Sequence, residues 1–161
     1  MKTILIRAGA ILALCLAFVG SFNLVSMALD REPPIFYEGA KAVTPDAQRG
    51  GAIDVEFKVF RKRICDQTVR RYLTDSQGIR HSIPSYTVGI QMLAGRETYQ
   101  RSITIPTAAS VGPATYEVVI DYQCNLLQGI LGSIRVTSPP IAFNILPESG
   151  LLVAPRNDSD G

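Results

Sequence analysis

Apolar and polar residues alternate with a period of two along most of the chain, which is typical of β-strands with one buried face. The clearest stretch is 112–124, GPATYEVVIDYQC, where a Gly-Pro turn leads into alternation that ends at Cys124. A second stretch, 52–60, alternates in the same way. Shorter apolar runs of strand length lie at 69–73, 79–83, 86–93, 99–105, 134–136 and 141–145.

Glycine and proline separate most of these runs, as expected for turns between strands. Beyond the N-terminal segment no stretch has a persuasive helical period, although 125–131 has room for one helical turn. Short strands with turns at intervals of about ten residues indicate an antiparallel β-sandwich. The sequence therefore predicts an all-β fold with a single β-sandwich domain at 52–147.

The N-terminal segment has a different pattern, because 8–29 contains no charged residue. As a helix this run would be roughly 33 Å long, which is sufficient to cross the hydrocarbon core of a bilayer. Lys2 and Arg7 precede it and acidic residues follow it. The positive-inside rule then places the N-terminus in the cytoplasm. We expect 1–29 to be a transmembrane signal anchor, with the remaining chain outside the cytoplasm, periplasmic or extracellular.

A cleaved signal peptide is the alternative interpretation of the same segment, with Ser-Met-Ala at 26–28 as the cleavage site. The apolar run is longer than the roughly 7 to 15 residues of a signal peptide, which favours the uncleaved anchor. Cys15 is preceded by a leucine and followed by more apolar residues, so we expect it to be a small hydrophobic residue of the helix.

Two segments flank the predicted domain. The stretch 30–51 mixes proline, glycine and charged residues and is expected to be a tether, with at most a short edge strand at 35–37. The C-terminal stretch 148–161 becomes polar and is expected to be a disordered tail.

The chain has three cysteines, and Cys65 and Cys124 belong to the predicted sandwich. In a sandwich of this type the second and sixth strands lie in opposing sheets and run in the same direction. Each of the two cysteines ends one of these runs, so both would lie at the same pole. In an oxidising compartment they would form an inter-sheet disulfide, and two reduced core thiols are the alternative.

Two short motifs carry a resemblance to known folds. Tyr122-Gln123-Cys124 resembles the Tyr-x-Cys of the sixth strand of immunoglobulin domains, and Gly-Pro-Ala-Thr-Tyr at 112–116 resembles the turn before that strand in fibronectin type III-like sandwiches. The chain has no tryptophan to pack on a disulfide. The resemblance implies an immunoglobulin-like or fibronectin type III-like architecture and implies no activity.

The sequence offers little for enzyme chemistry or metal binding. It contains one histidine, His81, and none of the usual motifs for hydrolases, phosphate-binding loops or zinc proteases. His81 follows Arg80 at a predicted hairpin, where we expect an exposed imidazole rather than a catalytic base paired with Cys65. Two acidic pairs are expected only to keep the outer faces of strands soluble, Asp54 with Glu56 and Glu117 with Asp121. We expect no catalytic residue, no cofactor and no metal site.

One local charge feature stands out against a formal net charge of only +2. Basic residues are concentrated from the end of the predicted run 52–60, around a turn and into the run 69–73, at Lys58, Arg61, Lys62, Arg63, Arg70 and Arg71. Such a cluster could form a docking surface for an anionic partner, such as a phosphorylated glycan, lipid headgroups or an acidic protein. The pattern favours the other interpretation, a solvated strand edge whose charges prevent edge-to-edge pairing. No aromatic residues interleave with the charges as in single-strand binders, so nucleic acid is an unlikely partner.

These observations together predict a membrane-anchored extracytoplasmic interaction module without catalytic activity, acting in adhesion, assembly or association with the cell envelope. Its expected partners are the membrane and an anionic envelope component or acidic protein. A virion or pilus structural subunit is one alternative. A hydrolase that processes envelope glycans is the other.

Overall fold

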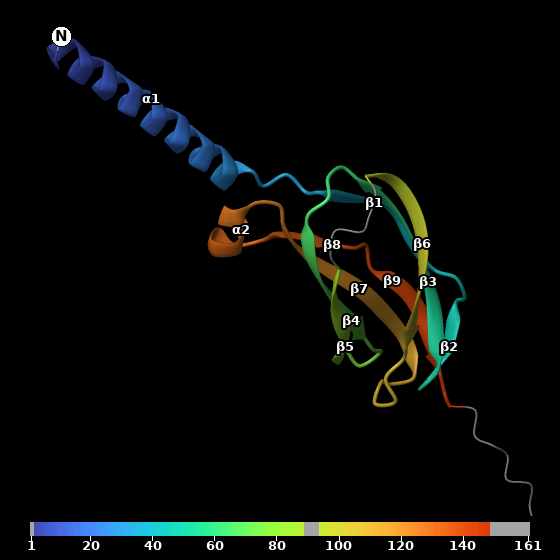
Figure 1. Cartoon of the computed structure of the whole chain (residues 1–161). Coiled ribbons are helices and arrows are strands. Elements are labelled where there is room, and N and C mark those ends of the chain that lie inside the picture. The colour runs from blue at the N-terminus through green and yellow to red at the C-terminus, as the bar shows by residue number, and fades with distance from the viewer. Residues whose placement is uncertain (1, 89–93, 149–161) are drawn as a thin grey trace, which may run out of the picture.

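The structure is a computed structural model and describes residues 2–88 and 94–148. One long helix, α1 (Lys2–Leu29), projects from a domain made of strands in two sheets (Figure 1). The expected all-β core and the expected apolar N-terminal helix are therefore both present.

The smaller sheet has three strands in the order β1-β3-β6, and all neighbours are antiparallel. These strands are β1 (Ile35–Ala42), β3 (Ala52–Arg61) and β6 (Gly95–Thr104). The larger sheet has the order β2-β9-β7-β4-β5, with β8 paired to β7. Its members are β2 (Asp46–Gln48), β4 (Asp66–Thr74), β5 (Arg80–Val88), β7 (Gly112–Gln123), β8 (Ile134–Thr137) and β9 (Ile141–Leu146). A short helix, α2 (Leu126–Leu131), links β7 to β8.

The core lies between the two sheets and is formed by every second residue of their strands. On β3 the buried positions are Ile53, Val55, Phe57 and Val59, and on β7 they are Ala114, Tyr116, Val118, Ile120 and Tyr122. Each large apolar side chain removed from water contributes about 1.5 to 3 kcal/mol. The apolar positions of the period-two pattern are therefore the side chains that face the other sheet.

The segment expected to be a tether, 30–51, instead contains β1 and β2. Strand β1 pairs with β3 along its length, from Ile35 opposite Arg61 to Ala42 opposite Val55, with a register shift next to Gly39. Hydrogen bonds to β3 hold this edge strand in the sheet on both sides of the shift. A segment whose composition is typical of a linker therefore forms an edge strand of the smaller sheet. The expected tail lies, from residue 149 onward, outside the described residues.

Helix α1 is long and apolar enough between Ile6 and Leu29 to cross a membrane, judged by length and composition. None of the window that meets this criterion is buried inside the structure. Its large apolar side chains are instead exposed, as Phe18 is at 74%. The core helix of a soluble domain would pack an apolar face against its neighbours.

Candidate functional site

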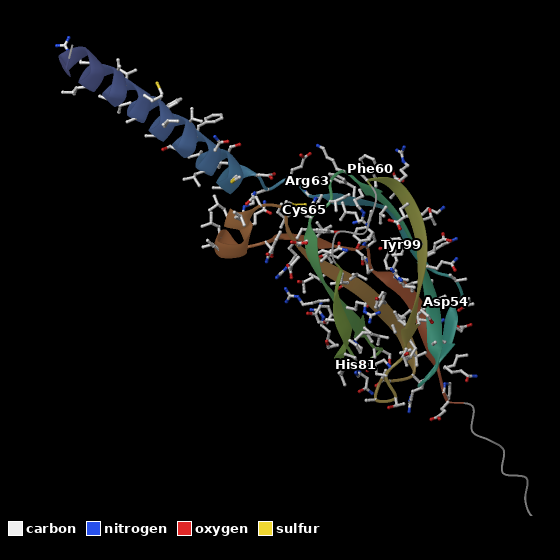
Figure 2. All side chains as sticks on the ribbon, viewed as in Figure 1. Asp54, Phe60, Arg63, Cys65, His81 and Tyr99 are labelled. Carbon is white, nitrogen blue, oxygen red and sulfur yellow. A yellow bond between two sulfur atoms is a disulfide. The ribbon has the colours of Figure 1, made fainter. Side chains whose placement is uncertain are left out.

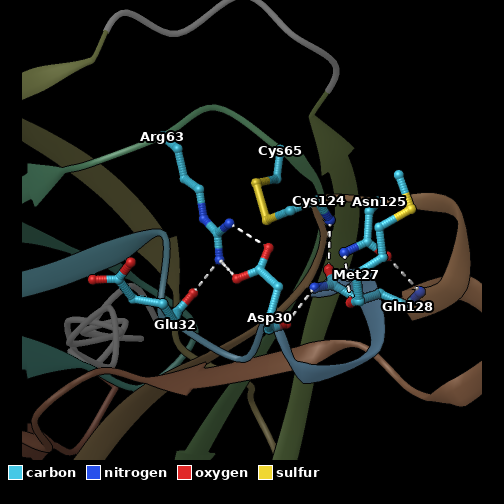
Figure 3. Close-up of a disulfide and its surroundings, with 8 residues drawn as sticks. All are labelled: Met27, Asp30, Glu32, Arg63, Cys65, Cys124, Asn125 and Gln128. Carbon is cyan, nitrogen blue, oxygen red and sulfur yellow. Dashed lines mark hydrogen bonds and ion pairs between the residues drawn. A yellow bond between two sulfur atoms is a disulfide. The ribbon is translucent and has the colours of Figure 1, made fainter. Parts of the chain in front are cut away.

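The C-terminal end of α1 meets the β domain at one pole, which we call the junction (Figure 3). Figure 2 shows Arg63 and Cys65 at this pole and His81 at the opposite one. The helix side of the junction consists of Met27, Asp30, Arg31 and Glu32, and the domain side consists of Lys62, Arg63, Cys65, Cys124, Asn125 and Gln128.

A disulfide joins Cys65 to Cys124 at the junction, with Cα atoms 4.6 Å apart. Cys65 directly precedes β4 and Cys124 directly follows β7, and the neighbouring pair in this ladder is Asp66 with Gln123. The expectation of an inter-sheet bond is therefore wrong, because the disulfide extends the pairing of two adjacent strands in one sheet. The chain leaves β3 at Arg61 and crosses to the other sheet before it reaches Cys65.

Helix α2 begins directly after the disulfide and is capped by Asn125, whose Oδ1 accepts a hydrogen bond from Gln128 N at 3.1 Å. The Gln128 side chain is almost fully buried, at 2% exposure. Its Oε1 accepts from Cys124 N at 2.7 Å, and its Nε2 donates to Asp30 O at 2.8 Å. Gln128 therefore connects the disulfide to the residue that follows α1. Asn-x-x-Gln is close to the capping-box pattern, which is the signal that could have identified it.

Two further hydrogen bonds reach carbonyl groups at helix ends. Asn125 Nδ2 donates to Met27 O at 3.1 Å, and Arg31 Nη1 donates to Gly132 O at 2.6 Å. Carbonyls in the last turn of a helix have no partner within that helix, so side chains from elsewhere can satisfy them. The cap residue of α2 therefore binds the last turn of α1, and a residue that follows α1 binds the carbonyl at the end of α2.

Ion pairs complete the junction. Arg63 contacts Asp30 through two parallel hydrogen bonds, Nη1 to Oδ2 at 2.6 Å and Nη2 to Oδ1 at 2.8 Å. These bonds hold the pKa of Asp30 below its usual value, against the opposite effect of burial, and they raise the pKa of Arg63. Lys62 pairs with Glu32, whose carbonyl oxygen also accepts from Arg63. Two members of the basic cluster therefore hold the segment that follows α1.

Arg61 and Lys58 lie on β3 but face opposite ways. Arg61 shares the phase of the buried positions and is 4% exposed, with Nη2 at 3.5 Å from Glu97 Oε2. Its aliphatic stem covers the edge of the core, as a buried arginine can. Lys58 is out of phase and exposed. Arg61 therefore presents no charge to a partner at the surface.

Arg70 and Arg71 belong to β4 in the other sheet. Arg70 pairs with Asp121 on β7, which also contacts Arg135 Nε on β8 at 2.8 Å. Burial alone would raise the pKa of Asp121, but the guanidinium groups of Arg135 and Arg70 outweigh it, so the pKa is lowered. Asp121 was expected only to keep its strand soluble; it is instead 8% exposed and bridges three strands. Arg71 Nε donates to Pro84 O at 3.1 Å.

The structure does not gather the six basic residues of the candidate docking surface on one face. Lys58 and Arg70 point outward from opposite sheets, and Arg61 is buried. Five of the six bond to other residues of the chain, namely Arg61, Lys62, Arg63, Arg70 and Arg71. In this structure most charges of the cluster form ion pairs or hydrogen bonds with other residues of the same chain.

At the opposite pole Asp75 organises the hairpin between β4 and β5. Its carboxylate accepts from Gln77 N, Ile79 N and Ser110 N, each at 3.0 Å, and lies 2.9 Å from His81 Nε2. The contact with His81, together with the backbone donors, holds the pKa of Asp75 well below its usual range. The expectation of an exposed imidazole is wrong, because His81 contacts the buried Asp75 carboxylate and its side chain is 14% exposed.

These lowered pKa values predict a domain that loses stability in acid. A carboxyl group whose pKa is lower in the folded chain stabilises it above the unfolded-state value, here about 3.8, and this stabilisation is lost as pH falls through the folded-state pKa. Thermal melts between about pH 5 and pH 2 should therefore show a steep fall in melting temperature. Asp75→Asn should flatten this slope, whereas Asp54→Asn, at an exposed position, should leave it unchanged. If the melting temperature fell equally steeply with pH in the natural chain, Asp75→Asn and Asp54→Asn, the role given to Asp75 would be contradicted.

Within residues 2–88 and 94–148, no group of three or more His, Cys, Asp or Glu residues could hold a metal ion. The hollow between the sheets, lined by Phe57, Arg61 and Tyr99 among others, has a volume of about 30 Å³. That is room for about one water molecule.

No protein-family model matches the chain, and no curated protein matches it. Among 97 matching chains of solved structures is the Pseudomonas fluorescens alkylpurine DNA glycosylase AlkC bound to DNA containing an abasic site analog. The identity is 11% and the TM-score is 0.43. The match covers 76% of this chain but 33% of the glycosylase chain, so this chain spans about a third of that protein's length.

This comparison contradicts two of the expectations drawn from the sequence. The matched protein is a DNA glycosylase bound to DNA, which does not agree with an extracytoplasmic interaction module or with nucleic acid as an unlikely partner. Neither a role in adhesion, assembly or envelope association nor the exclusion of nucleic acid is carried further. A TM-score of 0.43 is also too low to transfer DNA binding or glycosylase activity to this chain.

Proposed function

We propose that α1 spans a membrane once, and that the β domain lies outside the cytoplasm, where the junction holds it in a fixed orientation against the bilayer. Its role is positional, because the junction sets where the far pole of the domain lies relative to the membrane. One observation carries this proposal. Residues of the β domain bond the end of an apolar helix that the domain otherwise leaves uncovered.

The dimensions of α1 support a membrane span. The segment Ile6–Leu29 has 24 residues, which is roughly 36 Å of helix and exceeds the hydrocarbon thickness of about 30 Å. Lys2 and Arg7 flank one end, and Asp30 begins the acidic flank at the other. This charge asymmetry favours an N-terminus in the cytoplasm.

The disulfide supports the location of the domain. Bonds such as Cys65–Cys124 form and persist in oxidising compartments and are rare in the cytosol. The charge asymmetry around α1 and the Cys65–Cys124 bond therefore support the same side of the membrane for the domain.

The strand order supports an immunoglobulin-like arrangement for the domain. If β1, β3 and β6 are strands A, B and E, then β4, β5, β7 and β9 are strands C, C′, F and G. The observed orders, β1-β3-β6 and β9-β7-β4-β5, then agree with the two sheets of that fold. Helix α2 and β8 are inserted between strands F and G, next to the end of α1.

The length of β7 sets the scale of this positioning. The strand has 12 residues, or about 40 Å, and runs from the far pole at Gly112 to the disulfide at Cys124. Because the junction fixes the end near the membrane, the Asp75 hairpin at the far pole would stand roughly 40 Å from it along the strand direction.

Extraction of membranes with carbonate tests whether α1 spans the bilayer. The full-length chain should stay in the membrane pellet, and its intact mass should include the N-terminal residues. The matched variant Leu14→Lys/Phe18→Lys should lose this retention, because each lysine at the centre of a span costs about 2.5 to 3.5 kcal/mol. A soluble mature chain that begins at Leu29 would contradict the proposal and would identify the segment as a cleaved signal peptide.

A further inference from the structure

Helix α2 has the most exposed large apolar side chains of the β domain, among those the structure describes. Leu126 is 88% exposed, Ile130 is 82% exposed and Leu131 is 56% exposed. The next value in the domain is 50%, for Ile79 in the hairpin at the far pole. Three neighbouring leucine and isoleucine side chains in water are costly unless something covers them.

The outward direction of these side chains is fixed by the opposite face of α2. Gln128 is buried and bonds both Cys124 N and Asp30 O, and the Asn125 cap fixes the start of the helix. Leu126 and Ile130 are four residues apart and therefore lie on one face of α2, away from Gln128. Rotating the helix to bury them would break the hydrogen bonds of Gln128.

The position of α2 indicates what covers this face. Asn125 at its N-terminal end bonds Met27 O in the last turn of α1, and Arg31 bonds the carbonyl of Gly132 just beyond its C-terminal end. Both ends of α2 are therefore held beside the end of α1 (Figure 1). Met27 belongs to the segment Ile6–Leu29, so a bilayer crossed by α1 has its boundary between acyl chains and headgroups at about this level.

We infer that α2 is an interfacial membrane contact that inserts Leu126 and Ile130 into the boundary between lipid headgroups and acyl chains. The inference rests on the proposed function, because it requires α1 to span the bilayer. An apolar helix face lying in the plane of the interface is a known way to bind a lipid surface. With α1 as the first contact and α2 as the second, the domain is held at two points, which limits how far it can tilt.

Tryptophan fluorescence can test this in the full-length protein, because the natural chain contains no tryptophan. Three single variants are reconstituted into phosphatidylcholine vesicles whose acyl chains carry bromine at a shallow or a deep position. Ile130→Trp reports on α2, Phe18→Trp on the middle of α1, and Ile79→Trp on the far pole. All three positions are at least half exposed, so the new side chain fits without repacking a core.

The expected result is a different quenching pattern for each variant. Ile130→Trp should lose most of its emission with shallow bromines and less with deep ones. Phe18→Trp should show the reverse, and Ile79→Trp should be quenched by neither. Leu126→Trp, on the same face as Ile130, should repeat the shallow pattern.

Failure of the inference and failure of the proposed function give different results. If Phe18→Trp is quenched and Ile130→Trp is not, α1 spans the bilayer and the inference about α2 is overturned. If Phe18→Trp is also unquenched, the proposed span itself fails. Coverage by a second copy of the chain would make Ile130→Trp emission depend on the protein-to-lipid ratio without quenching by bromine, and this would also overturn the inference.

Discussion

Replacing Cys65 and Cys124 together by serine should lower the free energy of unfolding of the β domain by about 4 kcal/mol. The two cysteines are 59 residues apart in sequence, and a cross-link of that length removes many conformations from the unfolded chain. The bond joins the ends of β4 and β7, whose paired positions include Val69 opposite Ile120 in the core. The loss should therefore affect the whole domain.

Guanidinium denaturation of the full chain in detergent micelles, followed by tyrosine fluorescence, measures this difference. The matched control is Cys15→Ser, because Cys15 is exposed on α1 and has no partner among the described cysteines. It should unfold at the same denaturant concentration as the natural chain. A double variant within about 0.5 kcal/mol of the natural chain would show that the bond contributes nothing to stability.

Gln128→Leu should lower the free energy of unfolding by about 2 kcal/mol, although leucine is similar in size and α2 favours it. The change removes the acceptor of Cys124 N and the donor to Asp30 O, and both backbone groups then lie in a half-buried site without these partners. A polar group left unpaired away from water costs about 1 to 3 kcal/mol.

The same denaturation measurement separates this effect from a general loss of polarity. Gln77→Leu makes the identical chemical change at an exposed hairpin position and should be within about 0.5 kcal/mol of the natural chain. If Gln128→Leu were as stable as Gln77→Leu, Gln128 would not be the connection between the disulfide and the helix end.

The sequence predicted those elements whose side chains alternate because one face of a strand meets the core. Strand β3 (Ala52–Arg61) matches the run 52–60, and β7 (Gly112–Gln123) ends one residue before the run that ends at Cys124. The apolar segment of α1 was equally clear, because an uncharged run of that length has few other uses. Strand β1 was expected only as a short edge strand at 35–37, and β2 was not expected. Proline, glycine and charge obscure alternation at a sheet edge, where only part of each strand is buried.

The junction could be predicted only in part. The pairing of Cys65 with Cys124 at one pole is confirmed, although it was inferred from strands in opposing sheets and the bond joins neighbouring strands of one sheet. The partner of each basic residue was not predicted. Arg63 meets Asp30 and Arg70 meets Asp121, pairs that are 33 and 51 residues apart in sequence. Such pairs depend on how the strands are registered across the sheets and on where the chain leaves α1. A local cluster of positive charge was therefore a candidate docking surface, whereas the folded chain uses most of the charges internally.

The central claim is that one chain combines a membrane-spanning α1 with a β domain in an oxidising compartment. The most direct test is the redox state of all three cysteines in the membrane-bound protein, trapped with acid in intact cells. Free thiols are alkylated with one reagent under denaturing conditions, and thiols released by reduction are alkylated with a second. We predict the first reagent on Cys15 and the second on Cys65 and Cys124. The first reagent on all three cysteines of a membrane-bound chain would contradict the account and place the β domain in a reducing compartment.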